Sequence, residues 1–410
     1  MKLLFVHQHL GALGGAEANI QLTASELQRR GHHLALLHTS ATGRSEDSWR
    51  AIFKDSFSLN PRAKEESVLE ALYGFSPDAV YVHNMADLAV LQTLVGSGLP
   101  LVRMVHDHEM YCMRGYKYNY FTRQVCKRPA SAYCVFPCLA VIGRNRQGQW
   151  PVKWVSYKDK QKEIALNRRF DRFLVYSEYT KQELLRNGFD GNKIELNVPL
   201  RCWGRMGRVS SFSDRNLILY AGQIVRGKGV DILLKALAEV TEKFECIILG
   251  EGNHRPACER LCARLGLADR VKFQGFVRRE ELRNYYLECS VFVVSSVWPE
   301  PFGLTGPEAM RYGLPVVAFD AGGIAEWLID GVNGFLVPWM DIPGFAARVE
   351  HLLCDKELAR QMGQRGQEIV NEKYEATRQI RNLENIFHQL VNDCLGTPEP
   401  VPPVTQGICA

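Results

Sequence analysis

Short apolar runs alternate with helical patterns along most of this chain, and the alternation limits the possible folds more than any other sequence feature. In the first half, the runs are Lys2 to His7, His33 to His38, Ala79 to His83, Leu101 to His106 and Arg172 to Ser177. Ala16 to Arg30, followed by Gly31, is predicted to be an amphipathic helix. This alternation is typical of an α/β fold with a parallel sheet covered by helices, and ligands then bind at the carboxyl ends of the strands.

A second series of strands begins near Asn216. Its predicted members are Leu217 to Ala221, Cys246 to Leu249, Val271 to Gln274, Val291 to Val294, Val316 to Phe319 and Phe335 to Val337. A length of 410 residues is long for one domain, and two domains of about 200 residues each are expected. The polar stretch that ends at residue 214 separates the two series, so the linker is placed at 199–214.

The run from Val294 to Gly313 is the most informative for function. It places Glu300 and Glu308 on either side of a loop that is poor in bulky polar side chains. Pro307 suits the first position of a helix, where a missing N–H costs nothing. The N–H groups at a helix start suit a phosphate, and carboxylates accept hydrogen bonds from the hydroxyl groups of a nucleotide-sugar. Solvated glutamates beside an ordinary strand-to-helix connection are the alternative.

The order of the short motifs in this region carries a family resemblance. Glu-Pro-Phe-Gly-Leu-Thr is followed by Pro-Glu-Ala-Met, then by Gly-Leu-Pro-Val-Val-Ala and Gly-Gly-Ile-Ala-Glu. This series resembles the donor-binding signature of the GT-B glycosyltransferases of family 4 (glycosyl transferases group 1), which retain anomeric configuration. The resemblance implies two facing Rossmann-like domains, each with a parallel sheet, and a cleft between them.

The same resemblance gives the expected domain organisation. Residues 1–198 are expected to form the acceptor-side domain and 215–374 the nucleotide-sugar-binding domain. The helix 375–395 is expected to cross back to the first domain, as it does in the family. The proline-rich segment 396–410 has no periodicity and is predicted to be disordered.

The implied function is transfer of a sugar from a nucleotide-diphosphate sugar to a lipid-linked or saccharide acceptor, with no cofactor and no metal. The chain contains no Asp-x-Asp motif, so a metal-bridged diphosphate is not expected. Two alternatives stay open: a nucleotide-sugar epimerase of the same architecture, and a catalytically silent subunit that binds sugar nucleotides. The resemblance implies donor contacts from Glu300 (sugar), the backbone of Phe302, Gly303, Leu304 and Thr305, Glu308 (ribose), and Phe276 and Val277 (base).

A glycine-rich loop with basic residues opens the second domain. Gly222 and Gln223 follow a strand, and Arg226 and Lys228 come shortly after. In the family an arginine is expected where Gln223 stands, and Lys228 matches the family lysine. Cations next to a diphosphate stabilise the charge that develops on the leaving group. The alternative for Lys228 is an exposed lysine before a turn glycine.

Two features of the first domain are also candidates. Gly14 and Gly15 open a helix after the first strand, where small residues let the backbone approach a phosphate. A tight strand-to-helix turn is the alternative. His106 ends a strand and resembles the family histidine that lies beside the transferred sugar, although a histidine at a strand end is more often structural.

Composition and cysteine usage bound the remaining possibilities. The longest apolar regions are interrupted by polar residues, so a cytoplasmic protein without a transmembrane helix is expected. Most of the 12 cysteines, including Cys246, Cys258, Cys262 and Cys289, fall in apolar patterns and are expected in the core. A second group could bind zinc, although it has no Cys-x-x-Cys pair and ordinary unpaired thiols are the alternative. This group comprises Cys112, Cys126, Cys134 and Cys138.

Positive charge is concentrated in the interval 141–172. It holds nine lysines and arginines against three acidic residues, with Trp150, Trp154 and Tyr157 among them. Basic residues mixed with aromatic ones suit an anionic membrane surface. A solvated helix face and a nucleic-acid site are the alternatives. The net charge of +5 does not by itself indicate a nucleic-acid partner, and none is expected.

Overall fold

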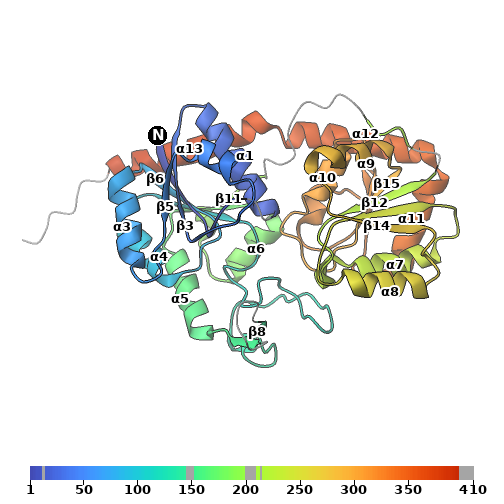
Figure 1. Ribbon diagram of the computed structural model, residues 1–410, viewed down its shortest axis with the longest axis horizontal. Coiled ribbons are helices and arrows are strands. Elements are labelled where there is room, and N and C mark those ends of the chain that lie inside the picture. The colour runs from blue at the N-terminus through green and yellow to red at the C-terminus, as the bar shows by residue number, and fades with distance from the viewer. Residues whose placement is uncertain (12–13, 145–151, 199–208, 213–214, 397–410) are drawn as a thin grey trace, which may run out of the picture.

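The computed structural model describes residues 1–11, 14–144, 152–198, 209–212 and 215–396, and it shows two α/β units side by side (Figure 1). All strands of the seven-stranded sheet in the first unit are parallel, in the order β11-β10-β7-β6-β1-β3-β5. The strands are β1 (Lys2–Val6), β3 (His33–His38), β5 (Asp55–Ser58), β6 (Ala79–Val82), β7 (Leu101–Val105), β10 (Arg172–Val175) and β11 (Ile194–Leu196).

Helices cover both faces of this sheet. Successive strand side chains point to opposite faces. Leu3 and Phe5 of β1 therefore belong to one buried cluster and Leu4 and Val6 to another. The helices are α1 (Gly15–Arg29), α2 (Glu46–Ile52), α3 (Lys64–Phe75), α4 (Leu88–Gly96), α5 (Tyr157–Asn167) and α6 (Glu178–Arg186).

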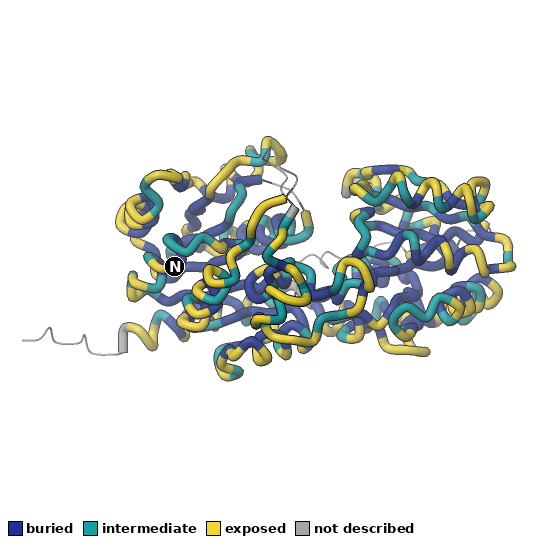
Figure 2. The backbone as a smooth tube through the Cα atoms, turned by 90° about the horizontal axis from the view of Figure 1, so that it is seen from below, coloured by how far each residue is buried: buried dark blue, intermediate teal, exposed yellow. Residues whose placement is uncertain are grey.

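The second unit repeats this arrangement around a six-stranded parallel sheet, in the order β14-β13-β12-β15-β16-β17. Its strands are β12 (Leu217–Ala221), β13 (Glu245–Leu249), β14 (Val271–Gly275), β15 (Val291–Val294), β16 (Val316–Phe319) and β17 (Gly334–Val337). Its helices are α7 (Val230–Glu239), α8 (Arg255–Arg264), α9 (Arg279–Glu288), α10 (Thr305–Met310), α11 (Ile342–Cys354) and α12 (Lys356–Lys373). Figure 2 shows the buried strands at the centre of each unit and exposed helix surfaces around them.

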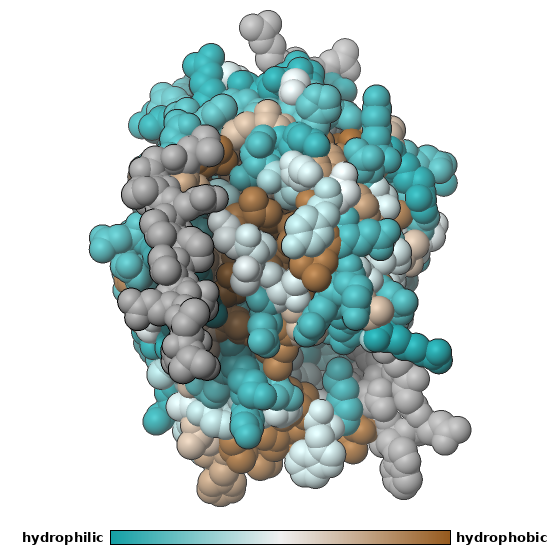
Figure 3. Space-filling model, turned by 90° about the vertical axis from the view of Figure 1, so that its left-hand side faces the viewer, coloured by the Kyte–Doolittle hydropathy of each residue, from teal (hydrophilic) through white to brown (hydrophobic). Residues whose placement is uncertain are grey.

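Several short elements lie outside the two sheets. β2 (His9–Leu10) pairs with β4 (Ser40–Ala41), and β8 (Ile142–Arg144) forms an antiparallel ribbon with β9 (Val152–Trp154). This ribbon projects below the first unit (Figure 1), and hydrophobic side chains are visible at the lower edge of that end of the molecule (Figure 3). The 3-10 turns are η1 (Ala132–Cys134), η2 (Gly191–Lys193), η4 (Arg226–Lys228) and η5 (Gly323–Glu326).

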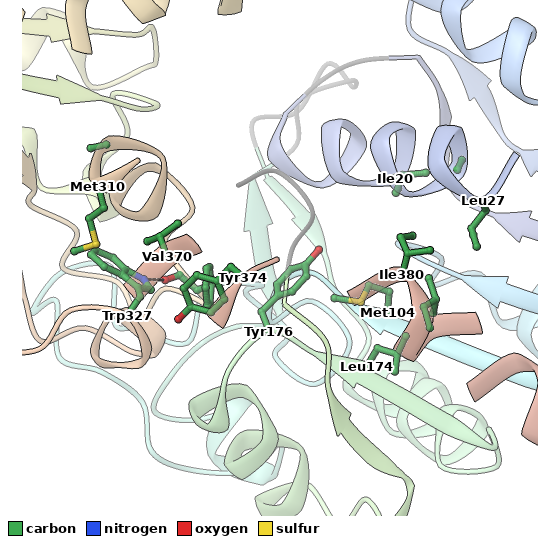
Figure 4. Packing of buried hydrophobic residues seen from close by; sticks show 14 of the residues in the cluster. Ile20, Leu27, Met104, Leu174, Tyr176, Met310, Trp327, Val370, Tyr374 and Ile380 are labelled. Atoms are coloured by element: carbon green, nitrogen blue, oxygen red, sulfur yellow. Dashed lines mark hydrogen bonds between the residues drawn. The ribbon is translucent and has the colours of Figure 1, made fainter. Parts of the chain in front are cut away.

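A long C-terminal helix, α13 (Ala376–Gly396), packs on the first unit. Glu384 of α13 lies 3.0 Å from both Arg30 and His32. The rings of Phe387 and Tyr81 are in edge-to-face contact, with centroids 5.4 Å apart. The cluster on this side of the sheets is continuous through both units (Figure 4). The two units therefore share one hydrophobic core along α12 and α13.

The predicted fold class, with two parallel α/β units, is confirmed, and most strands match their predicted runs. The histidines that end the runs, His7, His83 and His106, lie just beyond their strands. The predicted helix start at Pro307 is wrong, because α10 begins at Thr305. Neither β5 nor β11 was predicted. Most of the predicted linker and residues 397–410 of the predicted tail lie outside the described residues. Among the described helices, none is both long and apolar enough to cross a membrane.

Candidate active site at the junction of the two units

The carboxylate of Glu300 is fixed by three hydrogen-bond donors. Its Oε1 atom lies 2.6 Å from Lys228 Nζ and 2.8 Å from Trp298 Nε1, and it also accepts a hydrogen bond from the Ser296 hydroxyl. Glu300 is buried, with 5% of its surface exposed. Within the described part of the chain, Oε2 has no hydrogen-bond partner. One oxygen is thus used to orient the group, and the other remains available to a ligand hydroxyl.

The backbone of Glu300 is held by the Gly-Gly turn at the start of η5. Its N–H donates to Ala321 O at 3.0 Å, and its carbonyl accepts from Gly323 N at 2.7 Å. Gly322 lies against it with φ at 72°, and a Cβ there would lie 2.4 Å from Glu300 O and 2.6 Å from Glu300 N. Only glycine fits this conformation and this close approach. The Gly-Gly motif therefore positions Glu300.

The loop after Glu300 buries a side chain and leaves its backbone free. The Phe302 ring is buried in the core shared by the two units, and its carbonyl accepts from Trp327 Nε1 at 2.6 Å. In the described residues, the N–H groups of Gly303, Leu304 and Thr305 donate to no protein acceptor. Backbone N–H groups of this kind suit a phosphate. Because α10 has only six residues, the N–H groups themselves matter more than a helix dipole.

Glu308 lies half-buried in α10, one turn after this loop. The sequence placed Glu300 and Glu308 on either side of the loop, and the structure does so. Gly306, in the first turn of α10, packs against the indole of Trp327, where a Cβ would lie 2.1 Å from a ring carbon. This contact holds α10 against η5.

Lys228 approaches Glu300 from the loop after β12. Lys228 Nζ lies 5.0 Å from the centre of the Trp298 ring as well as in contact with the carboxylate. Gly229, with φ at 67°, allows the turn, since a Cβ there would lie 2.0 Å from Ser295 O. The loops after β12 and β15 are therefore packed backbone to backbone. This packing brings the lysine and the glutamate together.

The other residues predicted in this loop are placed differently. The Gln223 side chain is exposed, and its carbonyl accepts from the Tyr220 hydroxyl at 3.0 Å. Arg226 points to the first unit, where its Nε donates to Tyr120 O at 3.0 Å and its guanidinium lies over the Tyr120 ring. Lys228 is thus the cation of this loop that contacts Glu300, and Arg226 joins the two units.

Three glycines lie together at the ends of β12, β13 and β14. Gly250 N donates to Gly275 O at 2.7 Å, and a Cβ on Gly250 would lie 1.9 Å from Gly222 O. Phe276, next to Gly275, is 77% exposed, and Val277 is half-buried. Gly250 was not predicted as a site residue. Its position directly after an apolar run was the available signal, the same one that identified Gly222.

The first unit contacts the loop of the second unit at the residues directly before and after Glu300. His108 Nε2 lies 2.7 Å from Pro299 O, and the Ser177 hydroxyl donates to Pro301 O at 2.5 Å. Ser177 is also the N-cap of α6, because its Oγ accepts from Thr180 N. The carboxyl ends of the two sheets therefore meet at Glu300.

A second contact between the units lies beside the Lys228 loop. Arg123 Nη2 of the first unit is 2.6 Å from Asp231 Oδ2 of α7, and both side chains are largely buried. Tyr118, in the same segment as Arg123, lies against Gly227, where a Cβ would be 3.2 Å from the Tyr118 hydroxyl. The segment around Tyr118 to Arg123 thus covers the loop that carries Lys228.

His106 is surrounded by groups that occupy both of its ring nitrogens. Its Nε2 lies 2.9 Å from His83 Nδ1, and its Nδ1 lies 2.7 Å from the Tyr176 hydroxyl. Burial, and to a lesser extent the charge of His7, lowers the pKa of His106 to about 3. The ring is therefore neutral and has no free nitrogen for proton transfer to a ligand. His83 and Tyr176 were not predicted as site residues, although each directly follows a strand.

The loop that carries Gly14 is only partly described, because residues 12–13 lie outside the described residues. Gly14 N donates to Glu17 Oε2 at 2.8 Å, and Glu17 Oε1 lies 3.4 Å from His7 Nε2. Gly15 is the first residue of α1. At the start of α1, the N–H of Gly14 is thus already bonded to the carboxylate of Glu17. This contact was not predicted from the sequence.

A recess lies next to His106 at the carboxyl ends of β6 and β7. Its lining includes a buried arginine, Arg103, and three carboxylates, Asp107, Glu109 and Glu163. Arg103 Nη1 and Glu163 Oε1 are buried and have no partner among the described residues. The charge of Asp107, together with burial, raises the pKa of Glu109 to about 7. The recess therefore offers both donors and acceptors to a polar ligand.

Two predictions concern the cysteines: that one group lies in the core and that another could bind zinc. Cys246, Cys258, Cys262 and Cys289 are buried, as predicted. No three His, Cys, Asp or Glu side chains of the described residues are grouped so that they could hold a metal ion. The thiols of the proposed zinc group are free and partly buried and form no ligand set among the described residues, so zinc binding stays a prediction. These thiols are Cys112, Cys126, Cys134 and Cys138.

Comparison with known sequences finds one family model for each unit. A model described as "Glycosyl transferases group 1" matches residues 206–369, and one described as "Glycosyltransferase Family 4" matches residues 13–196. An alpha-D-kanosaminyltransferase of Streptomyces kanamyceticus is 32% identical over 180 residues, which are 43% of this chain and 46% of that protein. A D-inositol 3-phosphate glycosyltransferase of Xylanimonas cellulosilytica is 37% identical over 146 residues, 35% of each chain. The chain spans about half the length, or less, of these curated relatives.

Comparison with solved structures shows the same fold over nearly the whole chain. Anabaena HepE in complex with UDP and glucose has a TM-score of 0.71 at 19% identity, and the match covers 95% of this chain and 100% of that one. Sucrose-phosphate synthase of Thermosynechococcus elongatus has a TM-score of 0.69 at 18% identity, with 96% and 99% covered. At these identities the likeness concerns the fold.

Proposed function

The chain belongs to the group 1 glycosyltransferases of GT-B fold, and from this premise we propose that it transfers a sugar from a nucleotide-diphosphate sugar to a lipid-linked or saccharide acceptor. The observation that carries the proposal is the contact of Lys228 with Glu300 at the junction of the two units. A cation and free backbone N–H groups can bind a diphosphate, and a carboxylate with one free oxygen can accept hydrogen bonds from a sugar.

The donor would lie mainly on the second unit. Lys228 would move from Glu300 to the diphosphate, and the N–H groups of Gly303 to Thr305 would bind phosphate oxygens. Glu300 would then accept hydrogen bonds from sugar hydroxyls, while Glu308 would hold the ribose. The exposed Phe276 would flank the base. Anabaena HepE binds UDP and UDP-glucose in its structures, which supports a nucleotide-sugar as the donor class.

The proposed chemistry retains anomeric configuration without a metal. The bond from the anomeric carbon to the diphosphate breaks as the acceptor oxygen attacks from the same face. The acceptor proton passes to the departing phosphate oxygen. Lys228 and the backbone N–H groups stabilise the negative charge that forms on the diphosphate, where electrostatic stabilisation is most effective. His106 acts in this proposal as a neutral positioning group next to the sugar, because both its nitrogens are engaged.

The acceptor would enter from the first unit through the recess beside His106. Glu109 and Glu163 would accept hydrogen bonds from acceptor hydroxyls, and Arg103 would donate one. These groups lie at the same end of the first sheet as His108, which contacts Pro299 next to Glu300, so an acceptor there would approach the donor from the first unit. The recess is lined by both apolar and charged side chains, and its arginine and carboxylates support a saccharide or a polar head group at the acceptor position.

The proposal is tested by incubating the protein with UDP-, GDP- and ADP-sugars and measuring the products. Release of a nucleoside diphosphate with one donor supports transfer, or slow transfer to water when no acceptor is added. An isomerised donor would indicate an epimerase instead, and binding without turnover would indicate a silent subunit. Glu300→Ala is expected to abolish turnover while the fold is retained by circular dichroism. Unchanged turnover in this variant would refute the assignment.

A further inference from the structure

Exposed hydrophobic side chains are concentrated in one stretch of the first unit. Of the sixteen large hydrophobic side chains that are exposed in the described residues, eight lie between Tyr120 and Trp154. Single exposed hydrophobic residues are ordinary, but a cluster of them marks an interaction surface. We therefore expect this stretch to be an interaction surface.

The β8–β9 ribbon carries part of this cluster on one face. Ile142 pairs directly with Trp154, and Val152 lies two residues before Trp154. Residues opposite one another, and residues two apart, share a face of a two-stranded ribbon. Ile142, Val152 and Trp154 are 42%, 54% and 82% exposed. In the part of the chain that the structure describes, nothing covers this face.

The turn before β8 extends the same surface. Ile142 N donates to Leu139 O at 3.1 Å, so Leu139 lies directly at the base of the ribbon. Leu139 is 47% exposed, and Phe136, three residues earlier, is 76% exposed. We call Phe136, Leu139, Ile142, Val152 and Trp154 the apolar patch. Figure 1 places β8 at the lower end of the first unit, and hydrophobic side chains are seen at that end in Figure 3.

The charge around the apolar patch is of one sign. From Tyr120 to Lys158 the sequence has seven lysines and arginines and no aspartate or glutamate. One of the seven, Arg123, is buried in the ion pair with Asp231 and does not contribute to this surface. Lys127, Arg128, Lys153 and Lys158 are exposed. The Arg128 guanidinium lies 4.4 Å from the centre of the Tyr133 ring in η1, which brings it close to Phe136 in the chain. The patch thus has a positively charged rim.

The geometry points to an anionic membrane surface as the partner of this patch. Aromatic and aliphatic side chains enter the boundary between head groups and acyl chains, while lysines and arginines bind anionic lipids. A protein partner would need both an apolar depression and a surrounding ring of carboxylates, whereas an anionic bilayer offers both properties everywhere. The inference rests on exposure and charge alone and does not depend on the proposed sugar transfer.

Docking in this way would place the junction of the two units near the lipid. Tyr120 and Phe121, at the start of the same stretch, accept hydrogen bonds from Arg226 in the loop that carries Lys228. The recess beside His106 is also close in the chain, because Glu109 and Glu163 flank the stretch on either side. A lipid-linked acceptor could then reach the site without leaving the bilayer.

The test is co-sedimentation of the full chain with vesicles of phosphatidylcholine alone and of phosphatidylcholine mixed with phosphatidylserine. Binding is expected only to the anionic vesicles, and added salt should weaken it. The double variant Phe136→Ser/Trp154→Ser should bind at least about tenfold more weakly, by the loss of two buried aromatic side chains. Lys153→Glu/Lys158→Glu should lose on the order of fivefold for each cation removed. Tyr73→Ser is the matched control, because Tyr73 is 78% exposed on α3 and lies outside the patch.

Two results would overturn the inference. One is wild-type protein that stays in the supernatant with anionic vesicles at low salt. The other is a Phe136→Ser/Trp154→Ser variant that sediments as well as Tyr73→Ser. If light scattering shows a dimer that the double variant dissociates, and no vesicle binding, the patch is a contact between two copies instead. Donor turnover without vesicles is measured in parallel, so a failure of membrane docking and a failure of the proposed transfer are seen separately.

Discussion

His108 of the first unit donates a hydrogen bond from Nε2 to the carbonyl oxygen of Pro299 in the second unit, across 2.7 Å. A carbonyl oxygen only accepts, so Nε2 carries the proton and Nδ1 accepts from the Tyr111 hydroxyl, also at 2.7 Å. Burial lowers the pKa of His108, which favours this neutral form. Because Pro299 directly precedes Glu300, one histidine of the first unit fixes the backbone of the proposed donor site.

Replacement of this histidine should loosen the junction. In His108→Ala, Pro299 O and the Tyr111 hydroxyl would be left buried without a partner, at a cost of about 1–3 kcal/mol for each group. We expect a lower unfolding temperature and faster exchange of the backbone amide hydrogens of residues 295–304. His33→Ala, at an exposed histidine at the start of β3, serves as the control. Equal exchange in the two variants would show that the Pro299 contact does not hold the loop.

Lys228 should matter for turnover far more than a nearby lysine. Lys228→Met removes the charge proposed to stabilise the leaving diphosphate, and a fall in kcat on the order of 10²–10³ is expected. Lys228→Arg keeps the charge and should retain part of the rate. Lys235→Met is the matched control, since Lys235 is exposed on the following helix, α7. Nucleoside diphosphate release is the measurement, and similar rates for Lys228→Met and Lys235→Met would remove Lys228 from the mechanism.

Arg123 and Asp231 form a buried ion pair, so their contributions to the free energy of unfolding should be strongly coupled. Removing one partner leaves a buried charge unpaired, which costs about 3–5 kcal/mol. Arg123→Ala and Asp231→Ala should each destabilise the protein by an amount in this range. The double variant should lose less than the sum of the two, because neither charge then remains. Urea unfolding of all four proteins gives the coupling energy, and strictly additive losses would mean that the pair does not form.

The strands could be predicted because their apolar runs are short and continuous, as buried parallel strands require. β5 (Asp55–Ser58) was missed because it lies at the edge of the first sheet and is mostly polar and exposed. The start of α10 was misplaced for a different reason. Pro307 is compatible with any position of the first turn, so proline alone could not distinguish Thr305 from Pro307 as the start.

Residues of the candidate site could be predicted only where they belong to a recognisable motif within one short segment. Glu300 and Lys228 were found from local motifs, and they do meet in the structure. The contacts from His108, Ser177 and Arg123 could not be predicted, because each joins residues more than one hundred positions apart. The neutral state of His106 depends on burial among His83 and Tyr176, which a sequence pattern does not report.

The buried histidines should make the protein sensitive to acid. The folded-state pKa of His106 is lowered by burial to about 3, and burial also lowers the pKa values of His83 and His108. Between that value and the ordinary 6.5, the unfolded chain binds more protons than the folded one, so stability falls as pH falls. His106 alone should account for about 2 kcal/mol between pH 7 and pH 5.

Glu109 and Glu163 act in the opposite direction, because their pKa values are raised in the folded state. The difference in pH dependence of stability between a variant and the wild type is therefore more informative than the pH dependence of the wild type alone. The unfolding temperature of His106→Gln should depend less on pH between 7 and 5 than that of the wild type. Parallel curves for the two proteins would show that His106 is not the neutral, buried group inferred here.

Gly322 offers the sharpest test of how the second unit positions Glu300. Gly322 and Gly331 both have φ at 72°, a conformation that costs an alanine about 1–2 kcal/mol. They differ in their surroundings, because a Cβ at Gly322 would lie 2.4 Å from Glu300 O, whereas a Cβ at Gly331 would meet nothing within 4 Å. Gly331→Ala should therefore show the backbone cost alone. Gly322→Ala must in addition displace the backbone of Glu300, so it should lose more stability and most of its turnover. If the two variants had the same stability and turnover, Glu300 would not be held in place by the Gly-Gly turn.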